Sequence, residues 1–519
     1  MANVEPSTGA KKETRLYNSM RNTAANLIGQ VLFVIAGLFL KRVMLQTLGT
    51  ERIGLNYLFS DIIALLSIAE LGLTGIIAYH LYKPLAVGNK DRVKQLMGFF
   101  KRSYALLGLL VIVAGIAIVP FLDHLVGETS LQTWYIAVVF LLFLARGAEG
   151  YFLSYKQIVL HADQKNYIVT IVDIATSIVY TLIAIYVVLK TENFIYVIAL
   201  DVFKKTVNDG ILIAIVNRKY PYLKKNRKIT LPKEDRKVIG QDVKNAFASR
   251  ISSSVITATD NVVISTNLGI AVTGLYSNYV VVFKIIEEIL IKSIESVQAS
   301  VGNLLAENKN DITYSVLNKI TLVTFFLVSI SGTCLLALTT PFISIWFGEQ
   351  YLLVEAIVWI SVLNIFIHVM QMGLKQYSRA AGLFVQNRKI DLTSCGLNIV
   401  FSIMGVWIWG IEGVLAATFI ARSVEFYLRM KAVFEYVVKS GYGAYLWKTA
   451  RFFLLFLLEL GILWLVKGQV QTEAFLLEFL IYGFIAVVMP FALNVLFYHK
   501  TEDFKYIVKE LEQIGIKRK

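Results

Sequence analysis

Apolar runs of about 20 residues recur along the whole chain, and they constrain the fold more than any other feature. A run of this length crosses a bilayer as an α-helix, in which every backbone polar group is satisfied internally. Alternating strands of about ten residues, as in a membrane barrel, do not occur. The 519-residue chain is 56% hydrophobic, which is too apolar for a soluble globular protein. The sequence therefore predicts an all-α polytopic membrane protein.

We predict about 14 transmembrane helices. Twelve of them form two pseudo-symmetric lobes of six helices each, near 22–46, 53–79, 97–120, 132–154, 167–189 and 194–216, then 243–267, 273–298, 317–340, 352–374, 390–409 and 411–430. Two C-terminal helices follow near 449–466 and 474–497, and an amphipathic tail covers 500–519. The predicted domains are an N-lobe (1–216), a basic linker (217–241), a C-lobe (242–440) and the C-terminal helices with the tail (441–519).

An internal repeat supports the two lobes. The pattern Leu-Gly, four residues, Gly-Leu occurs at 48–55 and again 220 residues later at 268–275. Asp91 matches Asp311 at the same offset, and Lys156-Gln157 is echoed by Lys375-Gln376. Because each lobe has an even number of spans, both lobes begin on the same side of the membrane. The repeat is therefore a parallel one, as in several transporter folds.

The distribution of basic residues predicts the orientation. The segments on the amino-terminal side of the membrane hold most of the Lys and Arg, whereas the opposite side holds only Arg52, Lys190 and Lys467. Positive loops stay in the cytoplasm, so we expect both termini to be cytoplasmic. The net charge of +15 then reflects this loop bias, and no nucleic-acid partner is implied. The basic linker is expected to be a solvated tether, or a segment attracted to anionic lipid headgroups.

Ionisable residues inside the spans are costly in lipid and indicate a polar interior between the lobes. Cations there would suit an anionic cargo such as a phosphate group. The candidate substrate-binding residues are Lys41, Arg42, Arg146, Arg250, Lys284 and Lys292. Carboxylates could bind a coupling H⁺ or Na⁺, and the candidates are Asp61, Glu70, Asp173 and Asp260. The alternative is local neutralisation on one helix, by Arg146–Glu149, Lys205–Asp209, Lys284–Glu288 and Arg422–Glu425. Snorkelling of Lys41 and Arg42 to the outer interface is a further alternative.

No motif indicates catalysis or a bound cofactor. The chain has no phosphate-binding Walker loop, no Gly-x-Ser-x-Gly elbow and no His-Glu-x-x-His. The two cysteines, Cys334 and Cys395, lie inside predicted helices and provide no zinc-ligand spacing. We expect neither a metal nor a cofactor, and no enzyme activity. His368, in the tenth span, is expected to be a packed or cavity-lining side chain.

Two sequence stretches carry a family resemblance. They are Leu-Gly-Thr-Glu-Arg-Ile-Gly-Leu at 48–55 and Ala-Glu-Leu-Gly-Leu at 69–73 followed by Leu-Tyr-Lys-Pro-Leu at 81–85. With the predicted helix count and the duplicated lobes, the chain resembles the Wzx-type polysaccharide flippases of the multidrug/oligosaccharidyl-lipid/polysaccharide (MOP) exporter superfamily. The resemblance covers about residues 15–440 at the level of organisation.

The resemblance implies a flippase in the bacterial cell membrane. Its cargo would be an undecaprenyl-diphosphate-linked oligosaccharide repeat unit, moved to the outer leaflet by alternating access. Membrane lipids, a coupling H⁺ or Na⁺, a polysaccharide polymerase and glycosyltransferases are the implied partners. A cation-coupled multidrug antiporter of the same superfamily is the alternative, and a polysaccharide polymerase or ligase is a third reading. Such enzymes usually carry a large outer loop, which this chain lacks.

Overall fold

The computed structural model describes residues 8–223, 231–295, 297, 301, 304–305, 310–467 and 475–516. No strand occurs within these ranges, and nearly all of the described residues are helical. Among the described residues, ten helices are long and apolar enough to cross a membrane, and large apolar side chains such as Leu109 and Val113 are more than half exposed on them. Such exposure would be a liability in water and fits a surface that faces lipid. The prediction of an all-α polytopic membrane protein is confirmed.

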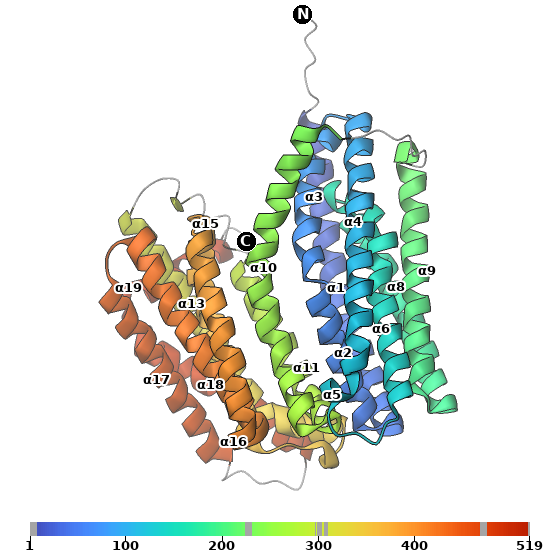
Figure 1. Cartoon of the computed structure of the whole chain (residues 1–519). Helices are drawn as coiled ribbons and strands as arrows, with labels where there is room; N and C mark the ends of the chain where they lie inside the picture. Colours follow the sequence, from blue (N-terminus) through green and yellow to red (C-terminus); the bar gives the residue numbers. More distant parts are fainter. Residues whose placement is uncertain are drawn as a thin grey trace, which may run out of the picture. The chain divides into compact units, whose positions relative to one another are not determined.

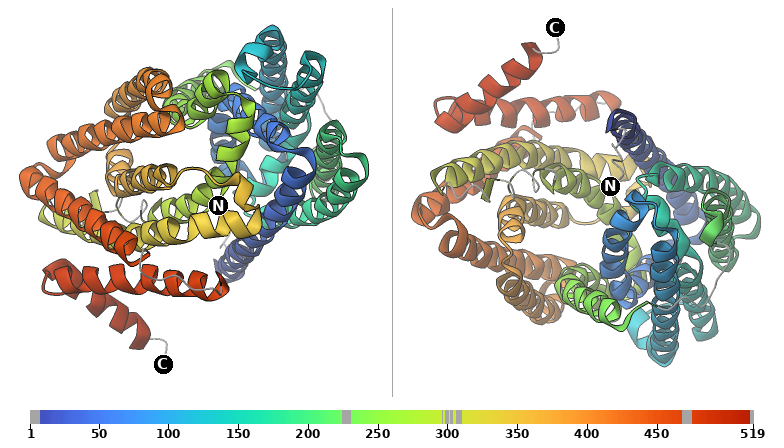
Figure 2. Two further views of the ribbon diagram at one scale, coloured as in Figure 1. Left: turned by 90° about the horizontal axis from the view of Figure 1, so that it is seen from below. Right: turned by 90° about the horizontal axis from the view of Figure 1, so that it is seen from above.

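Contacts divide the chain into two compact units, Met1–Gly274 and Leu275–Lys519. Figures 1 and 2 show that the helices of each unit run side by side as a bundle. The first unit contains α1 (Thr8–Leu48), α2 (Thr50–Leu66), α3 (Ile68–Ala86), α4 (Lys90–Ile118), α5 (Leu122–Val126), α6 (Thr133–Leu153), α7 (Ile158–Ala162), α8 (Asn166–Thr191), α9 (Phe194–Lys219) and α10 (Lys233–Leu268). Helix α11 (Ile270–Glu295) begins in this unit and continues in the second.

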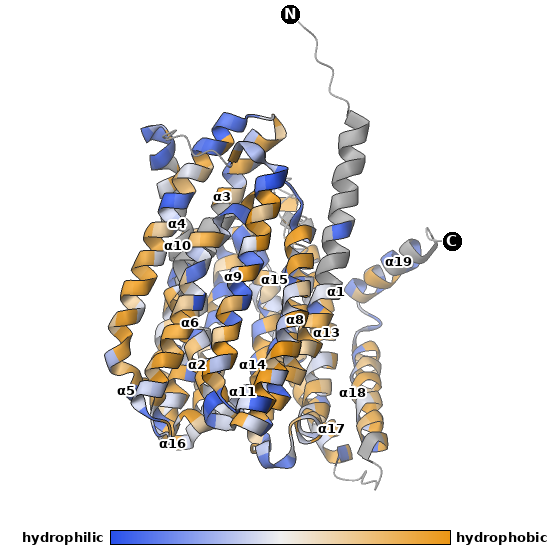
Figure 3. Ribbon diagram, turned by 90° about the vertical axis from the view of Figure 1, so that its right-hand side faces the viewer, coloured by the Kyte–Doolittle hydropathy of each residue, from blue (hydrophilic) through white to orange (hydrophobic). Residues whose placement is uncertain are grey.

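The second unit continues with α13 (Asn310–Trp346), α14 (Glu355–Met370), α15 (Met372–Ala380), α16 (Phe384–Val433), α17 (Tyr442–Lys467), α18 (Phe475–Tyr498) and α19 (Glu502–Ile516). Short 3-10 turns η1 (Val119–Phe121), η2 (Ser154–Gln157), η3 (Pro221–Leu223) and η4 (Glu349–Tyr351) and the π-turn η5 (Phe434–Val438) join some of these helices. Figure 3 shows hydrophobic residues along most helices of both units.

The helices occupy all of the predicted spans. The second span is α2 and α3 together, interrupted at Ser67. Helix α16 holds the eleventh and twelfth spans, because the backbone reverses at Trp409 and at Gly410, where φ is 61°. The two arms of α16 then run close together, and a side chain on Gly413 would approach the Gly405 carbonyl oxygen to 1.9 Å.

The repeat in the sequence corresponds to a repeat in the backbone. Gly49 joins α1 to α2 with φ 85° and ψ 174°, and Gly269 joins α10 to α11 with φ 86° and ψ 162°. Only glycine adopts these angles without strain, which explains why glycine stands at both junctions. The same Leu-Gly pattern therefore builds the same helix–helix corner twice, and the two pseudo-symmetric lobes are confirmed at these corners.

The two corners also touch each other within the first unit. A Cβ atom added to Gly54 would lie 2.1 Å from the Ile270 carbonyl oxygen, and one added to Gly274 would lie 2.0 Å from the Thr50 carbonyl oxygen. Thr50 and Ile270 are separated by the repeat offset of 220 residues, as are Gly54 and Gly274. The contact is therefore reciprocal, and it brings the first turns of α2 and α11 together backbone to backbone.

Helix α10 packs against α2, α3 and α5 of the first unit. Its residues 242–268 were assigned to the predicted C-lobe, and the lobe boundaries stay a prediction. The basic linker falls partly on residues 224–230, which lie outside the described ranges. Its last residues, from Lys233 onward, form the first turns of α10.

Candidate functional site

The first unit places one predicted cation, Arg146, in an ion pair between two helices. Its Nη1 lies 2.6 Å from Asp201 Oδ2, which joins α6 to α9. The Arg146 side chain is 40% exposed and the Asp201 side chain 17%, so the pair lies at the edge of the bundle. The neutralising partner is on another helix, rather than Glu149 on the same helix.

Two more carboxylates of the first unit sit in a connected polar network. Asp209 is fully buried, accepts a hydrogen bond of 2.6 Å from Ser154 Oγ and pairs with Lys205 at 3.3 Å. Asp173, a predicted ion-coupling residue, accepts a hydrogen bond of 2.8 Å from Asn208 Nδ2. Thr176 Oγ1 donates to the side-chain oxygen Oδ1 of Asn208 at 3.1 Å. This network joins α8 and α9 through groups that satisfy one another.

The remaining predicted residues of the first unit lie on α1, α2, α3 and α10. Lys41 is 8% exposed and donates to Tyr57 Oη at 3.4 Å, with its ammonium 4.6 Å from the tyrosine ring centre. Asp61 accepts a hydrogen bond of 2.5 Å from Asn261 Nδ2 on α10. Arg42 and Asp260 are half-buried. The side chains of Glu70 and Arg250 lie outside what the structure describes.

The second unit contains a largely buried group of charged residues, which we call the charged cluster. It consists of Glu287 on α11, His368 on α14, Lys375 on α15, and Asp391, Arg422, Glu425 and Arg429 on α16. Four helices that are distant in sequence thus converge here. The cluster contains three basic and three acidic side chains, and His368 adds an imidazole.

One half of the charged cluster is built around Glu287. Its Oε1 lies 2.6 Å from His368 Nδ1 and 3.5 Å from Arg422 Nη1. Arg422 also donates to the Asn364 carbonyl oxygen at 3.1 Å. The side chains of Glu287 and Arg422 are 17% and 16% exposed, so one carboxylate holds two basic groups in a largely dry setting.

The other half is built around Arg429, whose side chain is 1% exposed. Its guanidinium lies 2.7 Å from Glu425 Oε1 and 2.5 Å from Asp391 Oδ1, and it donates to Asn387 Oδ1 at 2.7 Å. Lys375 lies 3.9 Å from the same Glu425 oxygen. The local pairing Arg422–Glu425 considered from the sequence is not what is found, because Arg422 turns to Glu287 and Glu425 to Arg429.

Unpaired amides accompany these charges on α15 and its N-terminal boundary. Gln371 and Gln376 are fully buried, and neither side-chain amide has a hydrogen-bond partner within the described part of the chain. An unsatisfied buried polar group costs about 1–3 kcal/mol. An amide both donates and accepts, so it can bind water or the hydroxyl of a sugar. The charges and the amides are thus polar groups buried among the apolar helices of the second unit.

The two predicted cations of α11 lie close in sequence to this cluster. Lys284 is half-buried and interacts electrostatically with Glu287. Lys292 is more than half exposed and pairs with Glu288 at 3.3 Å. The structure thus brings Lys284 to the charged cluster, whereas Lys292 belongs to a solvated pair of the kind that contributes little.

A sequence model of the family of polysaccharide biosynthesis proteins matches residues 89–356, which is more than half of the chain. The chain belongs to this family. No curated protein sequence matches it at a significant level.

Several solved structures are similar in fold to this polysaccharide biosynthesis protein. The lipid II flippase MurJ, in an inward closed conformation, is similar with a TM-score of 0.63 and 15% identity, over 90% of this chain and 99% of MurJ. A multidrug resistance MATE family transporter of the MOP superfamily, in an inward-facing conformation, gives a TM-score of 0.57 and 12% identity over 78% of this chain and 94% of its own. The Vibrio cholerae MATE transporter VcmN gives a TM-score of 0.53 and 14% identity, over 81% of this chain and 97% of its own. At 12–15% identity these similarities show a shared fold, and membership of the MOP superfamily stays a prediction.

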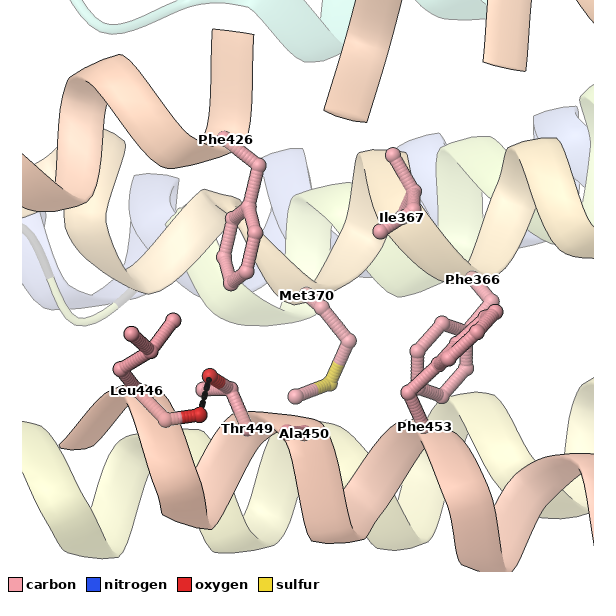
Figure 4. A pocket seen from close by; sticks show the side chains of 8 residues that line it. All are labelled: Phe366, Ile367, Met370, Phe426, Leu446, Thr449, Ala450 and Phe453. Atoms are coloured by element: carbon pink, nitrogen blue, oxygen red, sulfur yellow. Dashed lines mark hydrogen bonds between the residues drawn. The ribbon is translucent and has the colours of Figure 1, made fainter. Parts of the chain in front are cut away.

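The second unit of the polysaccharide biosynthesis protein contains an apolar cavity. It has a volume of about 160 Å³ and is bordered by α14, α16 and α17 (Figure 4). Phe366, Phe426 and Phe453 point into it together with Met370. Stacking of Phe366 on Phe456 at 4.4 Å fixes α17 against α14. The thirteenth span is therefore packed onto the C-terminal unit rather than standing apart.

A buried carboxylate joins the last two spans of the polysaccharide biosynthesis protein to α13. Glu459 on α17 is fully buried and accepts a hydrogen bond of 2.7 Å from Ser329 Oγ. Asn494 on α18 donates to the same Ser329 oxygen at 2.9 Å. The Glu459 carboxylate therefore lies in a helix interface.

Lys375, Arg429 and His368 are not among the site residues predicted from the sequence. The repeat does point to Lys375, because Lys156-Gln157 recurs as Lys375-Gln376. Lys156 reaches Asn217 on α9 at 2.8 Å, and Lys375 reaches Glu425 on α16, so both repeats send a lysine towards the sixth helix of the lobe. The tertiary partners themselves, such as Glu287 with His368, are 81 residues apart and left no local pattern.

Proposed function

We propose that this membrane protein is a flippase for a lipid-linked oligosaccharide. In this proposal it moves an undecaprenyl-diphosphate-linked repeat unit from the cytoplasmic to the outer leaflet of the bacterial cell membrane, by alternating access, with both termini in the cytoplasm. It acts as a carrier rather than an enzyme. The observation that carries the proposal is the charged cluster with its unpaired amides, buried among apolar helices in a member of a polysaccharide biosynthesis family.

The chemistry of the cluster fits the chemistry of that cargo. A diphosphate requires cations, and arginine and lysine donate strong hydrogen bonds to its oxygens. Sugars require groups that both donate and accept, which the Gln371 and Gln376 amides provide. Without cargo, the cluster's own carboxylates neutralise its cations. An anionic cargo would therefore displace Glu287 or Glu425 from the basic groups and pair with them instead. Such an exchange lets a site bind and release, since the cations are satisfied in either condition.

The six predicted cations and four predicted carboxylates remain candidates within this proposal. Lys284 is supported by its place next to Glu287. Asp61 and Asp173 each accept a hydrogen bond from an asparagine amide of a neighbouring helix, and both remain candidate coupling residues. H⁺ or Na⁺ as the coupling ion, and a polymerase or glycosyltransferases as partners, belong to the same proposal.

Deleting the gene provides the direct cellular test. We expect undecaprenyl-linked glycan to accumulate on the cytoplasmic leaflet, because synthesis continues while transfer stops. The measurement is mass spectrometry of the extracted lipid-linked glycan, with leaflet position read from protection against an external glycosidase. Unchanged glycan levels, with new sensitivity to cationic dyes, would instead establish the multidrug antiporter, which the similarity to MATE transporters keeps as the second candidate.

Glu287→Gln tests the charged cluster within this assay. The substitution keeps the side-chain shape but removes the charge that His368 and Arg422 share. We expect transport to fall at least about tenfold, since breaking one side of a buried pair typically costs 2 kcal/mol or more. Glu288→Gln is the matched control, because Glu288 is exposed and pairs with the exposed Lys292. Equal transport by the two variants at equal protein levels would remove Glu287 from the site.

A further inference from the structure

A second cavity lies at the start of α17, and nothing in the transport proposal uses it. Its volume is about 300 Å³, and its lining comes from the start of α13, the start of α17, the end of α18 and the start of α19. The lining residues that matter here are Asn318, Trp447, Lys448, Arg451 and Asp503. This volume is at the lower end of the range for small-ligand pockets. The basic-residue rule places this end of the helices on the cytoplasmic side.

Two basic side chains, Lys448 and Arg451, line this cavity one turn apart on α17. Lys448 donates to Asp503 Oδ2 at 2.8 Å and to Asn318 Oδ1 at 3.2 Å, and its side chain is 21% exposed. Arg451 lies over the Trp447 ring at 5.1 Å and forms no ion pair with any residue that the structure describes. Arg451 therefore keeps donors that are not used by a carboxylate.

The surroundings of Arg451 face the membrane at headgroup level. Trp447 is 57% exposed, and Leu454, two turns further along α17, is 59% exposed. On a spanning helix such side chains contact lipid, and tryptophan with arginine is the pairing found at the membrane–water interface. The cavity therefore opens to the layer of lipid phosphates rather than to the bilayer interior.

Asp503 already supplies an anion to this cavity. It comes from the first turn of α19, which is anchored on α13 by the Phe326–Phe504 ring contact at 5.9 Å. Lys319 of α13 also lies 3.4 Å from the centre of the Tyr506 ring. The tail helix is thus docked with its carboxylate against Lys448, where the oxygen of a phosphate group would otherwise bind.

We propose that this cavity binds the phosphate group of an anionic membrane lipid through Lys448 and Arg451, and that Asp503 competes with the lipid for Lys448. Bound lipid replaces the ion pair that holds the start of α19, so occupancy of the site loosens the tail helix from α13. Loss of Asp503 leaves Lys448 free for the lipid. The site is independent of the cargo route, and its existence does not rest on the proposed function.

Native mass spectrometry of the purified full chain, titrated with phosphatidylglycerol, tests the proposal. We expect Arg451→Gln to weaken binding about fivefold, the effect of one interfacial cation. Asp503→Asn should strengthen binding by a similar factor, because the competing anion is gone. Lys467→Gln is the matched control, since Lys467 lies at the opposite end of α17 and pairs with Glu355 at 3.1 Å. Thermal unfolding of each variant checks that the fold is retained.

Several results would contradict the proposed lipid site. If Arg451→Gln and Lys467→Gln bind the lipid alike, no phosphate site exists at Arg451. If Asp503→Asn weakens binding, Asp503 supports the site and the competition is wrong. Millimolar inorganic phosphate and zwitterionic phosphatidylethanolamine form the other two arms. Complete displacement of phosphatidylglycerol by inorganic phosphate would show that the site binds a free anion. Equal binding of phosphatidylglycerol and phosphatidylethanolamine would show that the site does not select lipids by their charge.

Discussion

Gly274→Ala, and separately Gly54→Ala, should abolish transport and lower the thermal unfolding midpoint, although each adds only one methyl group. The added Cβ atoms would lie 2.0 Å and 2.1 Å from backbone carbonyl oxygens, far inside van der Waals contact. Backbone cannot rotate away as a flexible side chain can, so the first turns of α2 and α11 must separate. Overpacking of this kind costs about 1–3 kcal/mol, and occasionally more. Transport should suffer further, because the two lobe corners meet at this contact.

Two other glycines provide the control for this prediction. Gly37 on α1 and Gly210 on α9 have nothing within 4 Å of an added Cβ atom. Alanine there removes the entropic cost of a helical glycine, so stability should rise by about 0.5–1 kcal/mol and transport should be retained. The effect of the same Gly→Ala substitution thus changes sign between the two pairs. The measurements are thermal unfolding in detergent and complementation of the deletion strain. Equal effects at all four positions would contradict the close approach of α2 and α11.

Arg429→Met should destabilise the second unit by about 3–5 kcal/mol. The side chain is 1% exposed, and it neutralises both Glu425 and Asp391. Without the guanidinium both carboxylates lose this partner, and Lys375, which lies 3.9 Å from Glu425, remains as a cation beside them. The cost is therefore the burial of unpaired charge rather than the loss of packing, because methionine fills much of the space of the arginine stem. Equilibrium unfolding in mixed micelles measures it.

Removing one of the two carboxylates as well should restore most of the stability. The double variant Arg429→Met, Asp391→Asn keeps Lys375 opposite Glu425, so the number of cations again matches the number of carboxylates at this place. Neutral replacements of buried ion networks are often tolerated. Lys292→Ala is the surface control and should change stability by no more than about 0.5 kcal/mol. A double variant as unstable as Arg429→Met alone would show that the guanidinium acts through shape and hydrogen bonding rather than charge.

The fold could be predicted largely from local sequence, because a membrane helix is specified by a continuous apolar run. The duplicated Leu-Gly corners were visible for a similar reason, since a positive φ requires glycine wherever the corner recurs. Two spans merged into α16, and one was divided into α2 and α3, but their positions along the chain were as expected. Hydropathy alone does not distinguish a tight reversal from a continuous helix.

The candidate site was much less accessible to sequence reasoning. Helical spacing suggested local pairs, and Lys205–Asp209 does form. Arg146 and Arg422 instead bind carboxylates on other helices, at Asp201 and Glu287. Those partners are chosen by tertiary packing, which periodicity does not contain. Burial was equally hidden, because nothing near Arg429 or Gln376 in the sequence separates them from exposed residues of the same type.

Flipping in reconstituted vesicles tests the central claim most directly. Purified protein would be placed in liposomes containing a fluorescent undecaprenyl-diphosphate-linked oligosaccharide, and the fraction accessible to an impermeant quencher would be followed over time. We predict that the fluorescent lipid becomes accessible to the quencher rapidly with the wild-type chain and at least about tenfold more slowly with Glu287→Gln. Glu288→Gln should match the wild type. A wild-type chain that moves this lipid no faster than protein-free vesicles, while exchanging cationic dyes against H⁺ or Na⁺, would contradict it.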